Sequence, residues 1–199
     1  MMEKVFVLAS NNAHKLEEFR AIFGRLDLLV LSQREAGVSV EPEENGTSFA
    51  ENAMIKARAV YDLCKQPTVA DDSGLCVDAL NGAPGIFSAR YGGKNSDAER
   101  RALLLENMKD IPKARRGAHF TSAIACIIDD QTSFVVQGHV FGTIDTRETG
   151  ENGFGYDSLF LPEHCGGKSF AMLSPAQKNK ISHRARALEA FAREYKNLL

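Results

Sequence analysis

The segment Val69–Leu75 carries two adjacent carboxylates, Asp71 and Asp72, at the end of a short apolar run and directly before Ser73 and Gly74. An apolar run that stops at charged residues is typical of a buried strand reaching the edge of a sheet, where α/β proteins place their chemistry. Carboxylates there can hold a metal ion or a water molecule. The alternative is a turn in which an Asp side chain accepts local backbone N–H bonds and Gly74 supplies a positive φ.

The two carboxylates cannot share one task, because adjacent residues of a strand point to opposite faces of the sheet. One is expected to shape the turn while the other faces the site. Glu44 and Asp72 form the natural pair for Mg²⁺, a hard cation that takes carboxylate oxygens and is commonly bound together with substrate phosphates. The sequence therefore predicts a magnesium site that includes Asp72, while Asp71, which points the other way, holds the loop or supports the site from behind.

Amide and basic side chains elsewhere in the chain have the chemistry of a phosphate site. Asn12 and Lys15 lie at a predicted strand-to-helix turn, where exposed backbone N–H groups and the helix dipole favour an anion. Lys56, Lys178 and Arg184 can add positive charge. A Walker pattern and a G-x-G-x-x-G after the first strand are both absent from the sequence, so neither a P-loop nor a Rossmann fold is indicated.

The segment Gly150–Asp157 places an aromatic residue, Phe154, among three glycines. Glycines let a backbone approach a ligand closely, and an aromatic side chain held among them offers a face for a planar ring. A ring-stacking Phe154 would complete a nucleotide site. The alternative is a β-bulge at a sheet corner with Phe154 tucked into the core.

Strand-like and helix-like patterns alternate along the chain and must position these residues. Strands are predicted at Lys4–Ala9 and in two long β-rich runs, 117–129 and 133–141, which a turn at Asp130–Gln131 joins into a hairpin. The sheet is therefore expected to be mixed rather than wholly parallel. Capping boxes predict three helix starts, at Ser48, Ser96 and Ser174.

Two predicted helices carry the basic residues. On the helix that follows the first capping box, Asn52 and Lys56 are four residues apart and are expected to point outward together. Near the C-terminus, Lys178 and His183 would lie about 140° apart on one continuous helix, at ~100° per residue. They can reach one ligand only if the helix breaks near Ser182, which is a suitable second N-cap. The alternative is a solvated basic helix face.

Composition limits the classes of protein and partner. The chain has 199 residues, of which 44% are hydrophobic and 25% charged, as in an ordinary globular protein of one large domain or two lobes sharing a core. With 24 basic and 26 acidic residues the net charge is −2, so no nucleic-acid partner and no membrane partner are expected. The apolar start is too short for a signal peptide, and no run approaches the ~20 apolar residues of a spanning helix. We expect a cytoplasmic protein.

Cysteine and histidine spacing gives no sign of a transition-metal site. His119 and His139 lie inside predicted strands without metal-ligand spacing, which favours packed or surface strand residues. No C-x-x-C pair is present, and buried free thiols are favoured over disulfides or zinc. The cysteines are Cys64, Cys76, Cys126 and Cys165.

Six regions of the chain, taken in order, resemble the motifs of the inosine triphosphate pyrophosphatase family, the Ham1-type non-canonical purine nucleoside triphosphatases. They are Ser10–Lys15; Glu43–Gly46 with Phe49–Ala53; Ala70–Leu75; Gly82–Gly85 with Ser88–Tyr91; Phe154–Asp157; and Ser182–Arg184. The resemblance covers essentially the whole chain. In the first motif Asn11 replaces a common glycine and His14 a small residue; because Asn tolerates left-handed backbone, the turn is expected to be kept.

The resemblance implies Mg²⁺-dependent hydrolysis of ITP, dITP, XTP and dXTP to the monophosphate and pyrophosphate, which clears deaminated purines from the nucleotide pool. It makes Asp72 the general base, and Glu44 and Asp72 the ligands of Mg²⁺. It also implies substrate binding by Ser10, Asn11, Asn12, Ala13, His14, Lys15, Lys56, Ser73, Phe154, Gly155, Tyr156, Asp157, Lys178, His183 and Arg184.

For the fold, the resemblance implies one domain over residues 1–199, with a mixed twisted sheet flanked by helices and two lobes around a central nucleotide cleft. The partner it implies is a purine nucleoside triphosphate, and the usual assembly is a homodimer.

Three other functions remain open from the residues. Asp72-Ser73-Gly74 matches the signature of aspartic proteases, although these need a second such aspartate and no metal. A non-catalytic nucleotide-binding module would share the same motifs. So would a related pyrophosphatase that acts on modified pyrimidine triphosphates.

Overall fold

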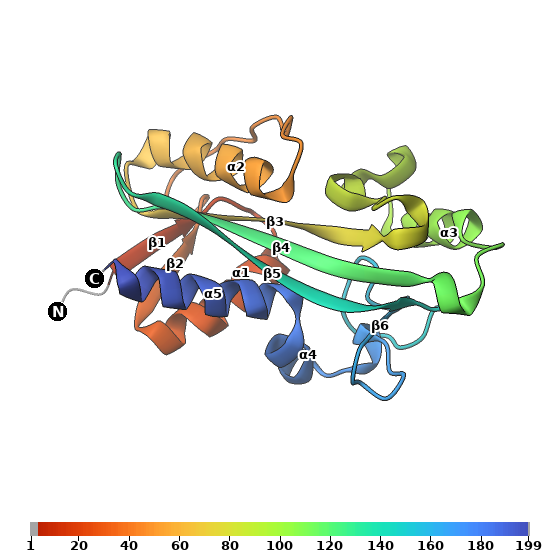
Figure 1. The fold of residues 1–199 in the computed structure, drawn as a ribbon. Coiled ribbons are helices and arrows are strands. Elements are labelled where there is room, and N and C mark those ends of the chain that lie inside the picture. Colours follow the sequence, from red (N-terminus) through yellow and green to blue (C-terminus); the bar gives the residue numbers. More distant parts are fainter. Residues whose placement is uncertain (1–3, 199) are drawn as a thin grey trace. The chain divides into compact units, whose positions relative to one another are not determined.

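A computed structural model describes residues 4–198, and its strands join in one six-stranded sheet of order β2-β1-β3-β4-β5-β6 (Figure 1). β1 is parallel to both β2 and β3, whereas β5 and β6 are antiparallel, so the predicted mixed α/β fold is confirmed. The strands are β1 (Lys4–Leu8), β2 (Leu28–Ser32), β3 (Thr68–Val77), β4 (Gly117–Ile127), β5 (Ser133–Ile144) and β6 (Phe160–Pro162). The α-helices are α1 (Ala13–Phe23), α2 (Phe49–Cys64), α3 (Asp97–Asn107), α4 (Pro175–Ile181) and α5 (His183–Asn197).

The chain forms two compact units. The first unit comprises the described residues up to Asp72, together with Ser122–Gly138 and the segment that starts at Arg184. The second unit comprises Ser73–Thr121 and His139–His183. Each of β3, β4 and β5 runs from one unit into the other. The single domain of two lobes that the sequence suggested stays a prediction.

In the first unit, β1 divides its side chains between two helical layers. Phe6 and Leu8 belong to the cluster formed with α1 and α5, whereas Val7 belongs to the cluster formed with α2. This alternation is expected of a strand that is buried on both faces. Figure 1 accordingly shows α2 on one face of these strands and α1 and α5 on the other.

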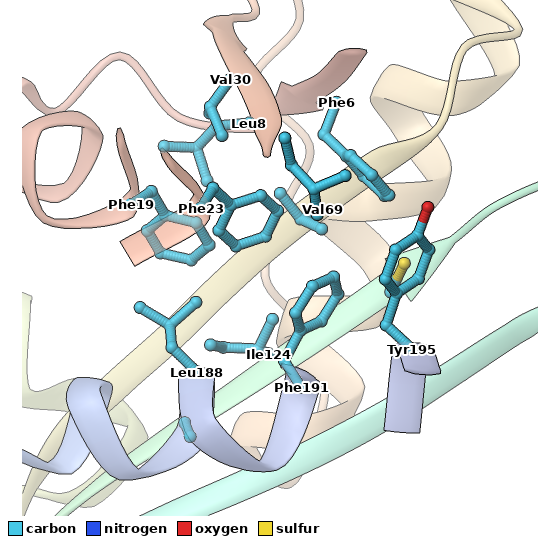
Figure 2. Close-up of a cluster of buried hydrophobic side chains, with 13 residues drawn as sticks. Phe6, Leu8, Phe19, Phe23, Val30, Val69, Ile124, Leu188, Phe191 and Tyr195 are labelled. Atoms are coloured by element: carbon cyan, nitrogen blue, oxygen red, sulfur yellow. The ribbon is translucent and has the colours of Figure 1, made fainter. Parts of the chain in front are cut away.

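Aromatic rings fill the core between the sheet, α1 and α5 (Figure 2). Phe23 stacks on Phe191 with ring centroids 4.8 Å apart, and Phe6 meets Phe23 edge-on at 5.6 Å. Each such pair adds about 0.5–1.5 kcal/mol to the free energy gained from burial. Val69 of β3 and Leu188 of α5 lie in the same cluster, so the strand that carries the acidic pair is held in place by packing against this core.

The second unit has a separate hydrophobic core. Leu75 and Val77 of β3 lie in it together with Phe120 of β4. Leu104 of helix α3 is fully buried in this core. Met108, at the C-terminal end of the helix, is buried in the same core. The position of α3 is therefore fixed by packing.

β3 does not end at the acidic pair, and this corrects both interpretations of Asp71 and Asp72 offered above. The strand continues to Val77, and Gly74 is not among the glycines with positive φ in the described residues. The physical reason lies downstream, since Leu75 and Val77 resume the alternating apolar pattern and pack in the second unit's core. Asp71 and Asp72 are therefore buried residues inside a strand.

The predicted capping residues start helices where expected. Ser96 and Ser174 each form a complete capping box, with Glu99 and Gln177 respectively. Ser48 also caps its helix through the N–H of Glu51. The Glu51 carboxylate, however, accepts hydrogen bonds from the N–H and hydroxyl of Thr47, one residue before the cap.

The four cysteines are free thiols, as expected, but only Cys126 is buried, and the other three are partly exposed. Among the residues that the structure describes, no helix combines the length and apolar character needed to cross a membrane.

Candidate active site

Asp72 is the only acidic residue in the described chain whose side chain has a buried oxygen without a hydrogen-bond partner, Oδ2. Its other oxygen, Oδ1, accepts a hydrogen bond from Lys56 Nζ of α2 at 2.8 Å. The same ammonium group lies 3.1 Å from Glu44 Oε1, so one lysine joins the two carboxylates predicted to bind a metal. The structure thus brings Glu44, Lys56 and Asp72 together within the first unit.

The negative charge of Asp72 is only partly compensated, because Asp72 shares Lys56 with Glu44. Burial raises the pKa of Asp72 and the neighbouring Glu44 raises it further, and together they outweigh the lowering by Lys56. Burial alone would lower the pKa of Lys56, but the charges of Asp72, Glu44 and Asp71 raise it, so the lysine stays protonated. Two carboxylates facing one lysine leave a site that a further cation would stabilise.

Asn52 fixes the loop that carries Glu44, a role that the sequence analysis missed. The side chain was expected to point outward but is fully buried, and its Oδ1 accepts a hydrogen bond from the Gly46 N–H at 2.9 Å. A Cβ atom at Gly46 would lie 2.7 Å from this Oδ1 and 2.8 Å from the Glu51 Cβ, so the close approach requires glycine. No sequence signal marked this role, because the spacing of Asn52 and Lys56 indicated a shared outward face.

Asp71 makes a different and fully occupied set of contacts. Its Oδ2 pairs with Lys15 Nζ at 2.8 Å and with Arg184 Nη2 at 3.1 Å, and its Oδ1 accepts from the Ser122 hydroxyl at 2.5 Å. Burial raises the pKa of Asp71, but the charges of Arg184 and Lys15 bring it well below its usual range. Arg184 is itself completely buried and also pairs with Glu18 of α1. Glu18 and Ser122 were not predicted from the sequence.

The segment Ser10–Lys15 forms the predicted strand-to-helix turn at the start of α1. Ser10 Oγ accepts the Asn12 N–H at 3.1 Å, and Asn12 Oδ1 caps the helix by accepting the Lys15 N–H at 3.1 Å. Asn11 is not among the described residues with positive φ, so the turn does not need the glycine that it replaces. Ala13 and His14 lie exposed in the first turn of α1. These residues present a helix N-terminus on which an anion can bind.

In the second unit, the loop around Phe154 is held from within by a buried ion pair. Lys178 Nζ lies 2.6 Å from Asp157 Oδ2, and the same oxygen accepts the Phe154 N–H at 3.0 Å. The ammonium also lies 4.6 Å from the centroid of the Phe154 ring, a cation–π contact. No strand occurs in residues 148–158, and Phe154 is only half-buried, so the β-bulge alternative is wrong.

The helix break that would let Lys178 and His183 reach one ligand is present. α4 ends at Ile181, Ser182 has extended backbone, and α5 begins at His183. Lys178 and His183 are both buried, which excludes the solvated basic face, and His183 stacks on Phe120 with centroids 4.8 Å apart.

The structure places the predicted site residues in two groups. Ser73 lies on β3 at the start of the second unit, and Tyr156 packs in that unit's core, where its hydroxyl donates to the Ser88 carbonyl at 2.9 Å. The first unit holds Ser10, Asn11, Asn12, Ala13, His14, Lys15, Glu44, Lys56, Asp72 and Arg184. The second holds Ser73, Phe154, Gly155, Tyr156, Asp157, Lys178 and His183.

The fold and the cluster around Asp72 define a class of mixed α/β protein in which a carboxylate on a central strand, Asp72, shares a helix lysine, Lys56, with the loop carboxylate Glu44. The chain belongs to the Ham1 family, whose model matches residues 6–194.

Several relatives match the chain over nearly its full length. It is 50% identical to a dITP/XTP pyrophosphatase of Pseudomonas aeruginosa, with 92% of each protein covered. It is 43% identical to a dITP/XTP pyrophosphatase of Clostridium perfringens, with 98% of this chain and 99% of the relative covered. Among solved structures, a HAM1 protein from Coxiella burnetii matches with a TM-score of 0.89 at 39% identity, covering 98% of this chain and 99% of that one.

Proposed function

We propose that this protein hydrolyses non-canonical purine nucleoside triphosphates, ITP, dITP, XTP and dXTP, to the monophosphate and pyrophosphate, and so removes deaminated purines from the nucleotide pool. Relatives named dITP/XTP pyrophosphatase at 43% and 50% identity support this activity. The observation that carries the proposal is the Asp72 carboxylate, which has one oxygen on Lys56 and the other buried without a partner. Such a group is suited to act on a water molecule at a phosphate anhydride.

Mg²⁺ fits the residues around Asp72. Glu44 and Asp72 supply the carboxylate oxygens that this hard cation prefers, and the buried Asp72 Oδ2 lacks a partner in the described chain. The raised pKa of Asp72 indicates that its negative charge is under-compensated. Glu44 and Asp72 would hold the ion, which when bound stabilises negative charge on the phosphate oxygens.

In the reaction, Asp72 accepts a proton from the attacking water as the anhydride bond between the α- and β-phosphates breaks. A carboxylate exposed to water is a weak base, and the burial of Asp72 removes solvent that would otherwise compete for this carboxylate. Lys15 and Lys56 carry positive charge toward the phosphate oxygens, and the N-terminus of α1 adds backbone N–H groups. Asp72 therefore acts at the reacting water while the lysines stabilise the developing charge.

Selectivity for the base depends on groups that meet its 6-keto oxygen, with Phe154 stacking on the ring. An adenine base would present an amino group to the same donors and leave them unpaired, at a cost of about 1–3 kcal/mol for each. His183 and Arg184 are the proposed donors, and Lys178 and Asp157 support the stacking residue. Their burial favours strong discrimination because an unpaired polar group costs most away from water.

The decisive experiment is a screen for pyrophosphate release with Mg²⁺, using ITP, dITP, XTP, GTP, ATP and modified pyrimidine triphosphates. We expect release from ITP, dITP and XTP to exceed that from ATP by at least about 100-fold, as two lost polar contacts would produce. Equal release across the panel would overturn the purine specificity. Removal of divalent cations with EDTA should abolish release, and peptide cleavage that survives EDTA would favour the protease alternative.

We also propose that the protein is a cytoplasmic homodimer, as the family resemblance implies. Sedimentation equilibrium of the purified chain should then give twice the monomer mass of 21.8 kDa. A monomer at micromolar concentration would contradict this assembly without affecting the proposed reaction.

A further inference from the structure

Two side chains of helix α3 form hydrogen bonds with the backbone of Gly155, in the loop that carries Phe154: one with its N–H and one with its carbonyl. Asp97 Oδ2 accepts the Gly155 N–H at 2.8 Å, and Arg101 Nη1 donates to the Gly155 carbonyl at 2.9 Å. Asp97 and Arg101 are one turn apart on α3 and therefore lie on the same face of the helix. Nothing in the sequence motifs points to either residue, and the reaction proposed above does not use them.

The same arginine also reaches the ends of the loop. Arg101 Nε lies 2.8 Å from Glu148 Oε2, and that oxygen accepts the Ser158 hydroxyl at 3.0 Å. Arg101 thus contacts Gly155 and Glu148 directly, and Glu148 links it to Ser158 on the far side of the loop. The helix is a firm support, because Leu104 is fully buried in the second unit's core.

Gly155 is a residue that needs such support. Its φ is +60°, in the left-handed region that favours glycine, and it has no side chain to anchor the peptide. Glycine has more conformational freedom than any other residue, and its two backbone hydrogen bonds to α3 are what restrict it. Phe154 precedes it directly, and its ring is half-buried beside Lys178. The direction of the Phe154 ring therefore depends on contacts at the next peptide.

We infer that Asp97 and Arg101 are positioning residues that hold the Phe154 ring in the orientation required to stack on a purine base. The inference rests on the proposed function in assigning the base to Phe154. It predicts that loosening α3 from Gly155 weakens binding of the base while the chemistry at Asp72 is unchanged.

The first test needs no substrate. The chain has no tryptophan, so Phe154→Trp places a single fluorescent reporter at the loop. In this background Arg101→Met keeps the aliphatic stem but removes the donors. We expect about a twofold rise in acrylamide quenching and a fall in anisotropy, because a loosened ring is more exposed and more mobile. Arg115→Met, at an exposed arginine of the same unit, is the matched control and should leave both signals unchanged.

The second test measures kinetics in the chain that retains Phe154. Arg101→Met should raise KM for ITP and for XTP about 3- to 10-fold, as expected for lost hydrogen bonds, with kcat within about twofold of the parent. Inorganic tripolyphosphate, which has no base, should inhibit the variant and the parent equally. Arg101→Lys keeps a charged donor and should restore part of the affinity, and Asp97→Asn, which keeps an acceptor oxygen, should fall between parent and Arg101→Met.

The results separate this inference from the proposed function. Unchanged quenching and unchanged KM in folded Arg101→Met would overturn the inference, and so would a fall in kcat at constant KM or an equal loss of tripolyphosphate inhibition. If the parent chain released no pyrophosphate from ITP or XTP, the proposed function would fail, while the quenching data would still decide whether α3 holds the loop. If Arg101→Met does not fold, as judged by thermal unfolding, the milder Arg101→Lys is used for the same measurements.

Discussion

Asp71 and Asp72 are neighbours on β3, but the first unit surrounds them with different amounts of compensating charge. Asp71 has two cationic partners and a hydroxyl donor, and its pKa lies well below the usual range because Arg184 and Lys15 outweigh burial. Asp72 shares a single lysine with Glu44, keeps one buried oxygen without a partner, and has a raised pKa because burial dominates. The charge of Asp71 is thus fully compensated by its partners, whereas the charge of Asp72 is not.

The difference separates a framework residue from a reacting one. A buried carboxylate that is fully paired holds its partners in one geometry, and removing it leaves those partners uncompensated. A buried carboxylate that is under-compensated has a free energy cost that a cation or a proton can relieve. We therefore expect changes at Asp72 to affect turnover and changes at Asp71 to affect stability.

The largest expected effect is that of Asp72→Asn on turnover. The amide cannot accept the proton of water and is a poor magnesium ligand, so kcat for ITP should fall by at least about 1,000-fold, the scale of a lost general base. Pyrophosphate release measures kcat, and calorimetry should show that ITP still binds. Asp110→Asn, at an exposed acid, is the control for a simple loss of one charge. Turnover near that of the parent would remove Asp72 from the mechanism.

Asp71→Asn should instead destabilise the protein, by about 3 kcal/mol in the free energy of unfolding, because Lys15 loses the Asp71 charge and the buried Arg184 is left with Glu18 alone. Urea unfolding at pH 7 measures this difference. A stability equal to the parent's would show that the Asp71 network does not hold the fold. The same measurement on Asp72→Asn should give no loss, since that change removes an under-compensated charge.

The acid dependence of stability should separate the two residues further. A carboxyl with a lowered pKa in the folded state stabilises the fold above its unfolded pKa of about 3.9, and this contribution is lost as pH falls through the folded value. Asp71→Asn should therefore lose less stability than the parent between about pH 5 and pH 2. Asp72 has the opposite sign, because its raised pKa means that protonation favours the folded state. A parallel acid loss in parent and Asp71→Asn would contradict the assignment.

A smaller effect is expected from Glu44→Gln, which leaves Asp72 in place but removes one metal oxygen. The Mg²⁺ concentration for half-maximal turnover should rise by about 10-fold, as when a charged ligand becomes neutral in a partly exposed site. A magnesium titration of pyrophosphate release measures it. The neighbouring Glu43→Gln is the matched control, because Glu43 is exposed. An unchanged magnesium requirement would exclude Glu44 from the metal site.

Local features of this molecule were predictable because they depend on residues close in sequence. Ser96 with Glu99 and Ser174 with Gln177 form their capping boxes within one helical turn, and the break at Ser182 follows from the same short-range chemistry. The acidic residues, lysines and Phe154 loop were also recognisable, because motifs combine residue types with spacing. These residues could be predicted as a site because their charges and ring are evident from residue type alone.

What could not be predicted depends on contacts between distant residues. Ser122 lies 51 positions from Asp71, and Arg184 lies 113 positions from it, so only the register of strands and helices brings them together. The extension of β3 past the acidic pair was hidden because two charges in a strand interior contradict the apolar pattern. Asn52 was assigned to the wrong side of α2 because its amide serves a loop six residues earlier. Each failure involves a buried polar group whose partners lie elsewhere in the chain.

The smallest expected effect tests whether Asp71 depends on its neutral partner as well as on its cations. Ser122→Ala removes the hydroxyl that donates to Asp71 Oδ1 and should lower the free energy of unfolding by about 1 kcal/mol, because Lys15 and Arg184 still pair with the carboxylate. Ser133→Ala, at an exposed serine of β5, should change it by less than about 0.5 kcal/mol. Urea unfolding of Ser122→Ala, Asp71→Asn and the double variant then forms a double-mutant cycle. Because the hydroxyl stabilises the fold through the charged carboxylate, its loss should cost less in the Asp71→Asn background, and strict additivity would mean that Ser122 contributes independently of Asp71.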